Sequence, residues 1–343
     1  MRFRSLFAFL AGGLAGALAA SPAVGGTTLE AVQQRDFLQC GVREGSLGLS
    51  LITDAGEWAG FFPDYCRAVA AAVLGRADAV DFVPVEAGSR FETLGSGTID
   101  VLSTTSTWTL RRDASLKLEW AGVLYYDGQG FLAHRALGVK SLSDVGAATV
   151  CVQASGTTTE KNLAEYTRLN NPKMKALTFE SFEGRLGAFL RRRCDLLTTD
   201  RLQLVGILAS RLANPDHYVL FPEIISKEPL GLVVRDDDPQ WFDIVKWVIY
   251  ATIAAEEKGV TSANVAVMRG SEDPEVRRLL GVDPGLGETL GLDEAWADRV
   301  IEQVGNYGEI FERNLGKNTP LGLERGLNAL WTEGGLMYAP PLR

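Results

Sequence analysis

The chain has 343 residues, of which 46% are hydrophobic and 22% are charged. This composition is too apolar for an intrinsically disordered chain and too often interrupted by charges for a polytopic membrane protein. The formal net charge of -9 argues against a nucleic-acid partner, and two histidines leave little material for His-based catalysis or a His-rich metal site. Because a single hydrophobic core rarely grows to this size, we expect two lobes. We expect neither a cofactor nor a bound metal.

The N-terminus has the pattern of a secretory signal peptide. Two arginines form a basic start, and an apolar stretch rich in small residues follows over 6–20. Sites with small residues at the required spacing place the cleavage after Ala19 or Ala23. The apolar stretch is too short and too rich in glycine for a typical membrane span, and no lipobox cysteine follows it. We therefore expect segment 1–23 to be a signal peptide and the mature protein to be periplasmic, with an uncleaved anchor as the alternative.

The four cysteines all lie in the mature part of the chain, which suggests disulfides in an exported protein. Four cysteines allow three connectivities. Closeness in sequence favours Cys40–Cys66 and Cys151–Cys194, with one bridge in each lobe. No pair has the CxxC spacing of a zinc site or of a thioredoxin-like redox motif.

Short strands and helices alternate from about residue 37 onward. Strands are expected at 37–42, 80–85 and 99–103, with a helix from Pro63 to Gly75 and a short helix over 90–96. This βαβαβ order predicts an α/β fold with a parallel sheet and helices on both of its faces.

The middle of the chain repeats this alternation. A strand is expected at 149–153, a helix at 181–193 and a further strand at 195–198. The sequence DVLSTT (100–105) has a weak echo in DLLTTD (195–200), which supports two similar lobes.

The part of the chain after the second lobe changes character. Residues 223–235 are rich in β-forming residues and predict a strand that crosses back to the first lobe. Helical patterns then follow over 241–258, 273–280 and 293–315. The role of residues 260–343 stays open, although their apolar stripes suggest packing against the first lobe.

Ligands of open parallel sheets bind beyond the carboxyl ends of the strands. An amino acid needs a planar, bidentate donor for its carboxylate, and Arg112 or its neighbour Arg111 can supply one. The ammonium group needs a carboxylate, and Asp200 lies at the predicted end of a strand. These positions predict a site shared by the two lobes.

Each of these signals also has a plainer interpretation. Asp200 can be the N-cap of the helix that follows it, and Arg112 can belong to a solvated charged turn. Thr157 and Glu160 have the spacing of a capping box, which indicates either simple capping or a helix start that binds a carboxylate. Only the combination of these signals indicates a site.

Several longer stretches resemble the periplasmic solute-binding proteins of ABC importers, specifically the long general L-amino-acid subgroup of solute-binding protein family 3. These stretches are CRAVAAAVLG (66–75), TWTLRRD (107–113), YYDGQGF (125–131), TTTEKNLAEY (157–166), EIISKEPLGLVVR (223–235), WFDIVKW (241–247), QVGNYGEIFERNLG (303–316) and RGLNALWTEGGLMYAPPLR (325–343). They span nearly the whole mature chain in order, and the last two are specific to the subgroup.

The resemblance implies a type II periplasmic-binding-protein fold. Two doubly wound sheets would be joined by two hinge strands and followed by a C-terminal helical extension. We expect lobe 1 to begin with residues 27–132, lobe 2 to span 133–228, and residues 229–343 to return to lobe 1 and form the extension.

The resemblance also implies the ligand-binding residues. Arg112 matches the arginine that holds the α-carboxylate, and Asp200 matches the aspartate that takes the α-ammonium. The positions that offer hydroxyl or N–H groups to the ligand correspond to Thr105, Thr107 and Thr158. Phe61 matches an aromatic residue that packs on the ligand side chain.

The chain departs from the family pattern beside the pocket. Relatives usually have Arg-Asn where this chain has Thr104-Thr105, Gly-Phe-Asp where it has Gly60-Phe61-Phe62, and Gly-Phe-Ser where it has Gly48-Leu49-Ser50. We therefore expect a shifted or narrowed ligand range, toward apolar or uncharged ligands.

The function that these observations favour is capture of an L-amino acid by a monomeric protein and its delivery to an inner-membrane ABC permease. The sequence contains no Gly-x-Ser-x-Gly, HExxH, GxGxxG or GxxxxGK[ST] motif, and we expect no enzymatic activity. The alternatives are a cyclic amino-acid dehydratase on the same scaffold and a ligand-sensing partner of a membrane receptor.

Overall fold

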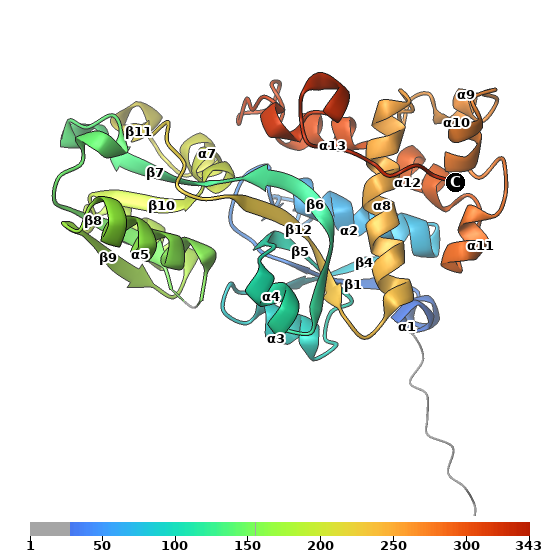
Figure 1. The fold of residues 1–343 in the computed structure, drawn as a ribbon, viewed down its shortest axis with the longest axis horizontal. Helices are drawn as coiled ribbons and strands as arrows, with labels where there is room; N and C mark the ends of the chain where they lie inside the picture. Colours follow the sequence, from blue (N-terminus) through green and yellow to red (C-terminus); the bar gives the residue numbers. More distant parts are fainter. Residues whose placement is uncertain (1–27, 155) are drawn as a thin grey trace, which may run out of the picture.

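The computed structural model describes residues 28–154 and 156–343, and it contains two α/β lobes that lie side by side (Figure 1). The predicted signal peptide, 1–23, lies outside the described residues. Each lobe is built on one five-stranded sheet, and the C-terminal helices lie against lobe 1. The predicted two-lobed α/β fold with a helical extension is confirmed.

The sheet of lobe 1 is mixed rather than purely parallel. Its strands, in spatial order, are β4 (Val80–Pro84), β1 (Leu38–Val42), β5 (Val101–Thr107), β12 (Glu228–Arg235) and β6 (Leu118–Asp127). β1 pairs in parallel with β4 and β5, as predicted, whereas β12 runs antiparallel to β5 and β6. The direction of β12 follows from the connectivity, because β6 leaves lobe 1 and β12 re-enters it.

The sheet of lobe 2 has the same mixed character. Its strands, in spatial order, are β11 (Tyr218–Leu220), β7 (Gln129–His134), β10 (Leu196–Asp200), β8 (Ala148–Gln153) and β9 (Met174–Phe179). β8 pairs in parallel with β9 and β10, and β7 is antiparallel to β10 because it enters the lobe from the hinge.

The chain crosses between the sheets twice. The first crossing lies between Asp127 and Gln129, and the second lies between Leu220 and Glu228. The predicted strand over 223–235 therefore begins later than expected, at Glu228. The predicted lobe boundaries at 132/133 and 228/229 stay predictions.

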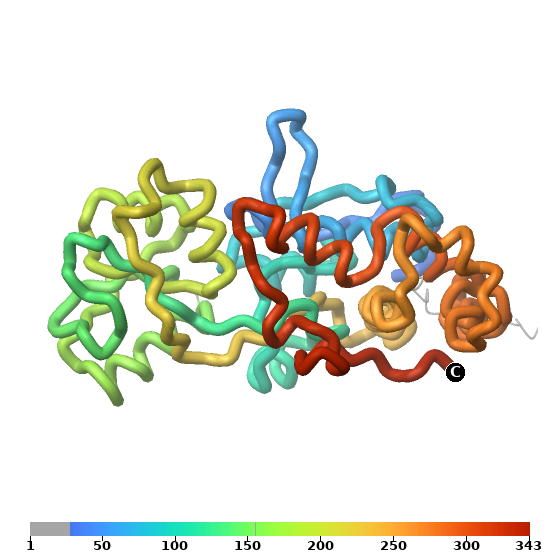
Figure 2. Tube along the Cα trace, turned by 90° about the horizontal axis from the view of Figure 1, so that it is seen from above, coloured from blue at the N-terminus to red at the C-terminus, as the bar shows by residue number. Residues whose placement is uncertain are grey.

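Helices cover both faces of each sheet (Figure 1). The helices of lobe 1 are α1 (Thr28–Arg35), α2 (Phe61–Leu74), α3 (Arg90–Gly95), α4 (Leu110–Ser115) and α8 (Pro239–Glu257). Those of lobe 2 are α5 (Thr158–Asn170), α6 (Phe182–Leu190) and α7 (Arg201–Ser210). A hairpin formed by β2 (Leu51–Ile52) and β3 (Trp58–Ala59) projects from lobe 1 (Figure 2).

The C-terminal extension packs on lobe 1 and shares its main hydrophobic core. It contains α9 (Val265–Met268), α10 (Pro274–Leu279), α11 (Leu286–Leu290), α12 (Trp296–Gln303) and α13 (Tyr307–Asn314). The helical stretch expected over 293–315 is divided into α12 and α13. Gly305 adopts a φ of 95°, and Asn306 starts α13 with a capping box to Glu309, so the first helix ends and a second one begins.

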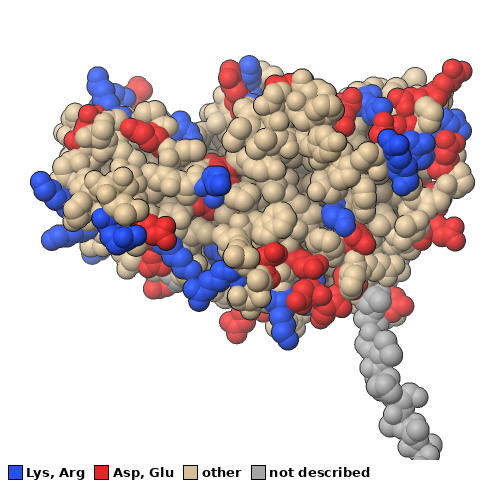
Figure 3. Space-filling model, viewed as in Figure 1, with Lys and Arg blue, Asp and Glu red and all other residues tan. Residues whose placement is uncertain are grey.

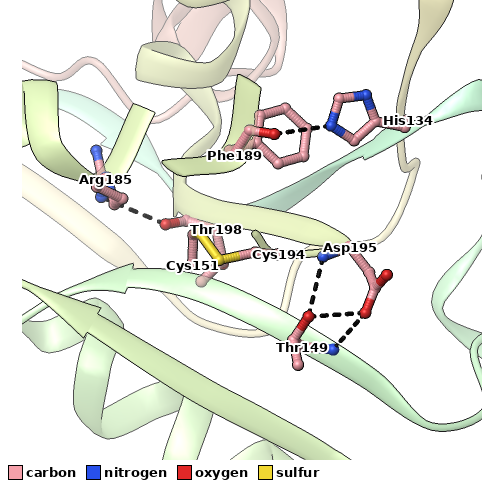
Figure 4. The surroundings of a disulfide bond; sticks show 8 residues. All are labelled: His134, Thr149, Cys151, Arg185, Phe189, Cys194, Asp195 and Thr198. Atoms are coloured by element: carbon pink, nitrogen blue, oxygen red, sulfur yellow. Dashed lines mark hydrogen bonds between the residues drawn. A yellow bond between two sulfur atoms is a disulfide. The ribbon is translucent and has the colours of Figure 1, made fainter. Parts of the chain in front are cut away.

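Both predicted disulfides are confirmed. Cys40 of β1 is bonded to Cys66 of α2, and Cys151 of β8 is bonded to Cys194 just before β10 (Figure 4). His134 lies near the second bridge, is buried, and forms a hydrogen bond of 2.9 Å with the backbone carbonyl of Phe189. Its position is structural.

Candidate functional site

A polar cavity lies between the two lobes, at the carboxyl ends of the central strands β5 and β10. We call this cavity the inner chamber. Its lining comprises Arg43, Ala87, Arg90, Thr105, Arg112, Gln153, Thr157, Thr158, Thr159, Arg185, Thr199 and Asp200. Four of the six predicted ligand-binding residues, namely Arg112, Asp200, Thr105 and Thr158, therefore meet around one cavity.

Arg112 is held in place by lobe 1. Thr109 caps α4, and the guanidinium Nη1 of Arg112 donates a hydrogen bond of 2.8 Å to the backbone carbonyl of Thr107. The guanidinium lies over the ring of Phe91, 5.0 Å from its centroid. Burial lowers the pKa of Arg112, while Glu228 and Asp200 oppose this effect. The group is thus fixed in position and still able to receive an anion.

Three further arginines, Arg43, Arg90 and Arg185, line the inner chamber. Within the described residues, the acceptors bonded to all four guanidinium groups are neutral. They are the side chains of Ser106, Gln153 and Gln203 and the backbone carbonyls of Ala87, Thr107 and Thr198. Burial and the neighbouring arginines lower the pKa of Arg90 to about 9, and burial and Arg43 do the same for Arg185. The chamber therefore attracts anionic groups.

Asp200 is the carboxylate of the inner chamber. It occupies the N-cap position of α7, but its side chain makes no capping hydrogen bond. It is 7% exposed, and in the described part of the chain its Oδ1 atom has no hydrogen-bond partner. Burial, together with Asp127 and Glu228, raises its pKa well above the ordinary value. A buried, unpaired acceptor of this kind is suited to a ligand ammonium.

Thr107 and Thr158 both form hydrogen bonds with the carboxylate of Glu228. The Glu228 Oε2 atom accepts hydrogen bonds of 2.5 Å from Thr107 in lobe 1 and 2.9 Å from Thr158 in lobe 2. Its Oε1 atom accepts from Asn162 of α5 and from Ser226. Thr107 is therefore placed beside the chamber rather than in its lining, and Glu228 connects the two lobes.

The start of α5 matches the helix N-terminus considered in the sequence. The Thr157 hydroxyl accepts from the backbone N–H of Glu160 at 3.2 Å, which is one half of the expected capping box. Both Thr157 and Thr158 line the inner chamber, so the positive end of this helix dipole faces the cavity.

Phe61 does not line the cavity, which corrects its expected contact with the ligand. It is fully buried in the core of lobe 1, where its ring packs against Tyr65, Tyr125 and Tyr307. Its neighbour Phe62 lines a second chamber beside the inner one. Adjacent residues of a helix point about 100° apart, so a shift of one position separates core from cavity.

Among the described residues, no group of three or more His, Cys, Asp or Glu side chains is placed so that it could hold a metal ion. Among the helices of the same residues, none combines the length and the apolar character that a membrane span requires.

Comparison with known proteins assigns the chain to a family. Residues 38–260 match the family model of bacterial extracellular solute-binding proteins, family 3. The general L-amino acid-binding periplasmic protein AapJ of Rhizobium johnstonii is 50% identical over 94% of both chains. The glutamate/glutamine/aspartate/asparagine-binding protein BztA of Rhodobacter capsulatus is 46% identical over 97% of this chain and 98% of its own.

A solved structure shares the fold over nearly the whole chain. It is a periplasmic binding protein of an ABC transporter from Brucella ovis with glutathione bound, and it is 49% identical. The TM-score is 0.90, and the match covers 93% of this chain and 100% of that one. All three relatives are binding proteins rather than enzymes, which supports a non-enzymatic transport component. The chain belongs to the bacterial extracellular solute-binding proteins of family 3.

Proposed function

We propose that this protein is the periplasmic component of an ABC importer that captures a molecule with an α-amino-acid head between its lobes. The observation that carries the proposal is the inner chamber, where the unpaired Asp200 carboxylate and the Arg112 guanidinium line one buried cavity. An amino acid supplies an ammonium for the first group and a carboxylate for the second. Amino acids and glutathione, the ligands of these relatives, all share this head.

The lining supports ligands with an additional anionic group rather than the apolar or uncharged ligands expected from the sequence. Arg43, Arg90, Arg112 and Arg185 surround a single lining carboxylate. An α-carboxylate would balance only part of this positive charge, and an apolar side chain would leave the rest without a counter-charge.

The location and the partners belong to the same proposal. The predicted signal peptide and the periplasmic relatives support export, and the ABC-transporter relatives support docking of the loaded monomer on an inner-membrane permease. Cell fractionation with and without residues 1–23 tests the location. Stimulation of ATP hydrolysis by the reconstituted transporter tests the docking.

A thermal-shift panel tests the binding role directly. The mature protein is refolded to remove endogenous ligand and mixed with each standard L-amino acid and with glutathione. A ligand at one hundred times its dissociation constant adds about 2.7 kcal/mol, which raises the melting temperature by several degrees. Asp200→Asn should abolish the shift, whereas the exposed Asp216→Asn should not. Absence of a shift with every compound would refute the proposal.

A further inference from the structure

We propose that the ligand is longer than a free amino acid: an α-amino acid whose side chain continues through an amide-containing tail to a second carboxylate, as in γ-glutamyl peptides. This inference rests on the proposed function, because the α-amino and α-carboxylate groups occupy the inner chamber. It adds a second part of the site that accommodates the tail.

A second chamber continues the inner one. It shares Arg43 and Thr105 with the inner chamber. The rest of its lining comprises Glu44, Gly45, Ser46, Leu49, Ser50, Phe62, Thr104 and Gln203. Under the proposal, the tail of a ligand bound at Asp200 runs past the side chains of Arg43 and Thr105, which the two chambers share.

Two buried hydroxyl groups of the second chamber have no partner. Ser46 and Ser50 are 4% and 3% exposed, and neither Oγ atom has a hydrogen-bond partner among the described residues. Their backbones pair with each other across a tight turn, which holds both hydroxyls on one side of the chamber. Buried polar atoms are rarely left unpaired, so a polar segment of the ligand accounts for them. Amide groups carry the donors and acceptors that two hydroxyls require.

The space for the tail comes from small side chains. Thr104 and Thr105 line the second chamber with short side chains. The Thr104 hydroxyl forms a hydrogen bond of 2.7 Å with the hydroxyl of Ser106, which belongs to the same strand, β5. An arginine at position 104 would place a longer, charged side chain at this wall of the chamber.

The charges place the second carboxylate near Arg43 rather than further out. Arg43 lines both chambers, and its guanidinium donates to the neutral side chain of Gln153 at 3.0 Å. An outer groove adjoins the second chamber and shares Arg43 and Glu44 with it; its other charged lining residues are Asp54, Glu86 and Glu183 against Arg211 alone. This groove repels an anionic end, so the tail should end within reach of Arg43.

Calorimetric titration of the stripped, full-length mature protein tests the inference with three probes. Glutathione has the γ-glutamyl linkage, L-glutamate lacks the tail, and the α-linked peptide Glu-Cys-Gly lacks a free α-carboxylate on its glutamyl residue. We expect glutathione to bind at least about tenfold more tightly than glutamate, and the α-linked peptide not to bind. Equal or tighter binding of glutamate would overturn the inference and leave the proposed function intact. If none of the three probes binds and no amino acid does either, both fail.

Variants of the second chamber give an independent test. Ser46→Ala combined with Ser50→Ala should reduce the preference for glutathione over glutamate about tenfold, because two hydrogen bonds to the tail are lost. Ser141→Ala with Ser143→Ala removes an exposed serine pair of lobe 2 and should leave this preference unchanged. Thr104→Arg should also reduce the preference by obstructing the chamber. An unchanged preference in both second-chamber variants would overturn the inference.

Discussion

The two lobes use the same strand arrangement to present different chemistry. The central strands β5 and β10 each follow an aspartate that accepts a backbone N–H from the neighbouring strand: Asp100 from Gln39 at 2.8 Å, and Asp195 from Thr149 at 2.7 Å. Five residues later, the equivalent positions are Thr105 in lobe 1 and Asp200 in lobe 2. Both line the inner chamber, so the carboxylate of the site comes from one lobe alone.

The lobes also differ in their charge and in the size of their hydrophobic cores. Lobe 1 provides Arg43, Arg90 and Arg112 from three separate elements, and its core continues into the C-terminal extension. Lobe 2 has two smaller cores, one on each face of its sheet. Residues 129–220 contain 12 Lys and Arg against 8 Asp and Glu, although the whole chain is acidic, and many of their basic side chains are visible in Figure 3. We infer that lobe 1 is the main anion-binding platform, and that lobe 2 is a smaller cap that contributes Asp200 and Arg185.

Removal of Arg112 should have the largest effect on binding. Arg112→Ala takes a buried guanidinium from the lobe 1 platform and leaves the ligand carboxylate short of donors. We expect a loss of about 2–5 kcal/mol in binding free energy, measured by calorimetric titration. Arg111→Ala, in the same turn but exposed, is the matched control and should bind normally. If Arg185→Ala in lobe 2 costs more than Arg112→Ala, the assignment of the platform to lobe 1 is wrong.

The disulfides test whether lobe 2, which has the smaller cores, depends more on its bridge for stability than lobe 1 does. Cys151→Ala with Cys194→Ala opens a loop with a sequence separation of 43 residues in the lobe with smaller cores, and the Cys40–Cys66 pair spans only 26 residues. We expect the first variant to lose about 2–4 kcal/mol in the free energy of unfolding of lobe 2, and to show a separate, earlier transition in calorimetry. Cys40→Ala with Cys66→Ala is the comparison. A larger loss in that variant would contradict the proposed order of stability.

Glu228 provides a test of the contact between platform and cap. Glu228→Gln replaces one acceptor oxygen of a carboxylate that is bonded to Thr107 on one side and to Thr158 and Asn162 on the other. We expect the contact between the two lobes to lose about 1.5–3 kcal/mol of stability, because hydrogen bonds to a charged group are replaced by weaker ones to a neutral amide. Small-angle X-ray scattering should then show a larger radius of gyration without ligand. Asn162→Ala should give a smaller change in the same direction, and an unchanged radius in both variants would refute the role of Glu228.

The sequence predicts the fold better than it predicts the site. The buried strands, the alternation with helices and the cysteine pairs are local features, and the structure confirms them. Arg112 and Asp200 follow a strand end and carry a family resemblance, so sequence reasoning placed them in one site; both line the inner chamber, and their contact with a ligand stays a prediction. Arg43, Arg90 and Arg185 were missed because they come from a loop and two helices, and nothing local distinguishes them from surface arginines. Their positive charge gathers around one cavity only in the folded protein, where the two lobes face each other.

The smallest expected effect is a dependence of binding on pH, and it separates the acidic side of the site from the cationic platform. Burial, together with Glu228, raises the pKa of Asp127 at the hinge to about 7, while Arg201 and the backbone N–H groups of Gly128 and Leu202 oppose the shift. The pKa of Asp200 is raised in the same direction. Because a ligand ammonium requires the ionised form of Asp200, and Asp127 is one of the charges that raise the pKa of Asp200, binding below neutral pH should release a proton.

Affinity should therefore fall as the pH decreases from about 8 to 5, by up to about tenfold per unit for one released proton. The stability of the ligand-free protein should change in the opposite sense. A carboxyl group whose pKa is raised on folding loses stability as the pH rises from its unfolded value, about 4, through about 7. Titrations in buffers with different ionisation enthalpies count the protons, and Asp127→Asn should flatten both profiles whereas the exposed Asp216→Asn should not. Affinity that is constant over this range would mean that the acidic groups are already ionised before the ligand arrives, and that lobe 2 presents a fixed charge rather than one created by binding.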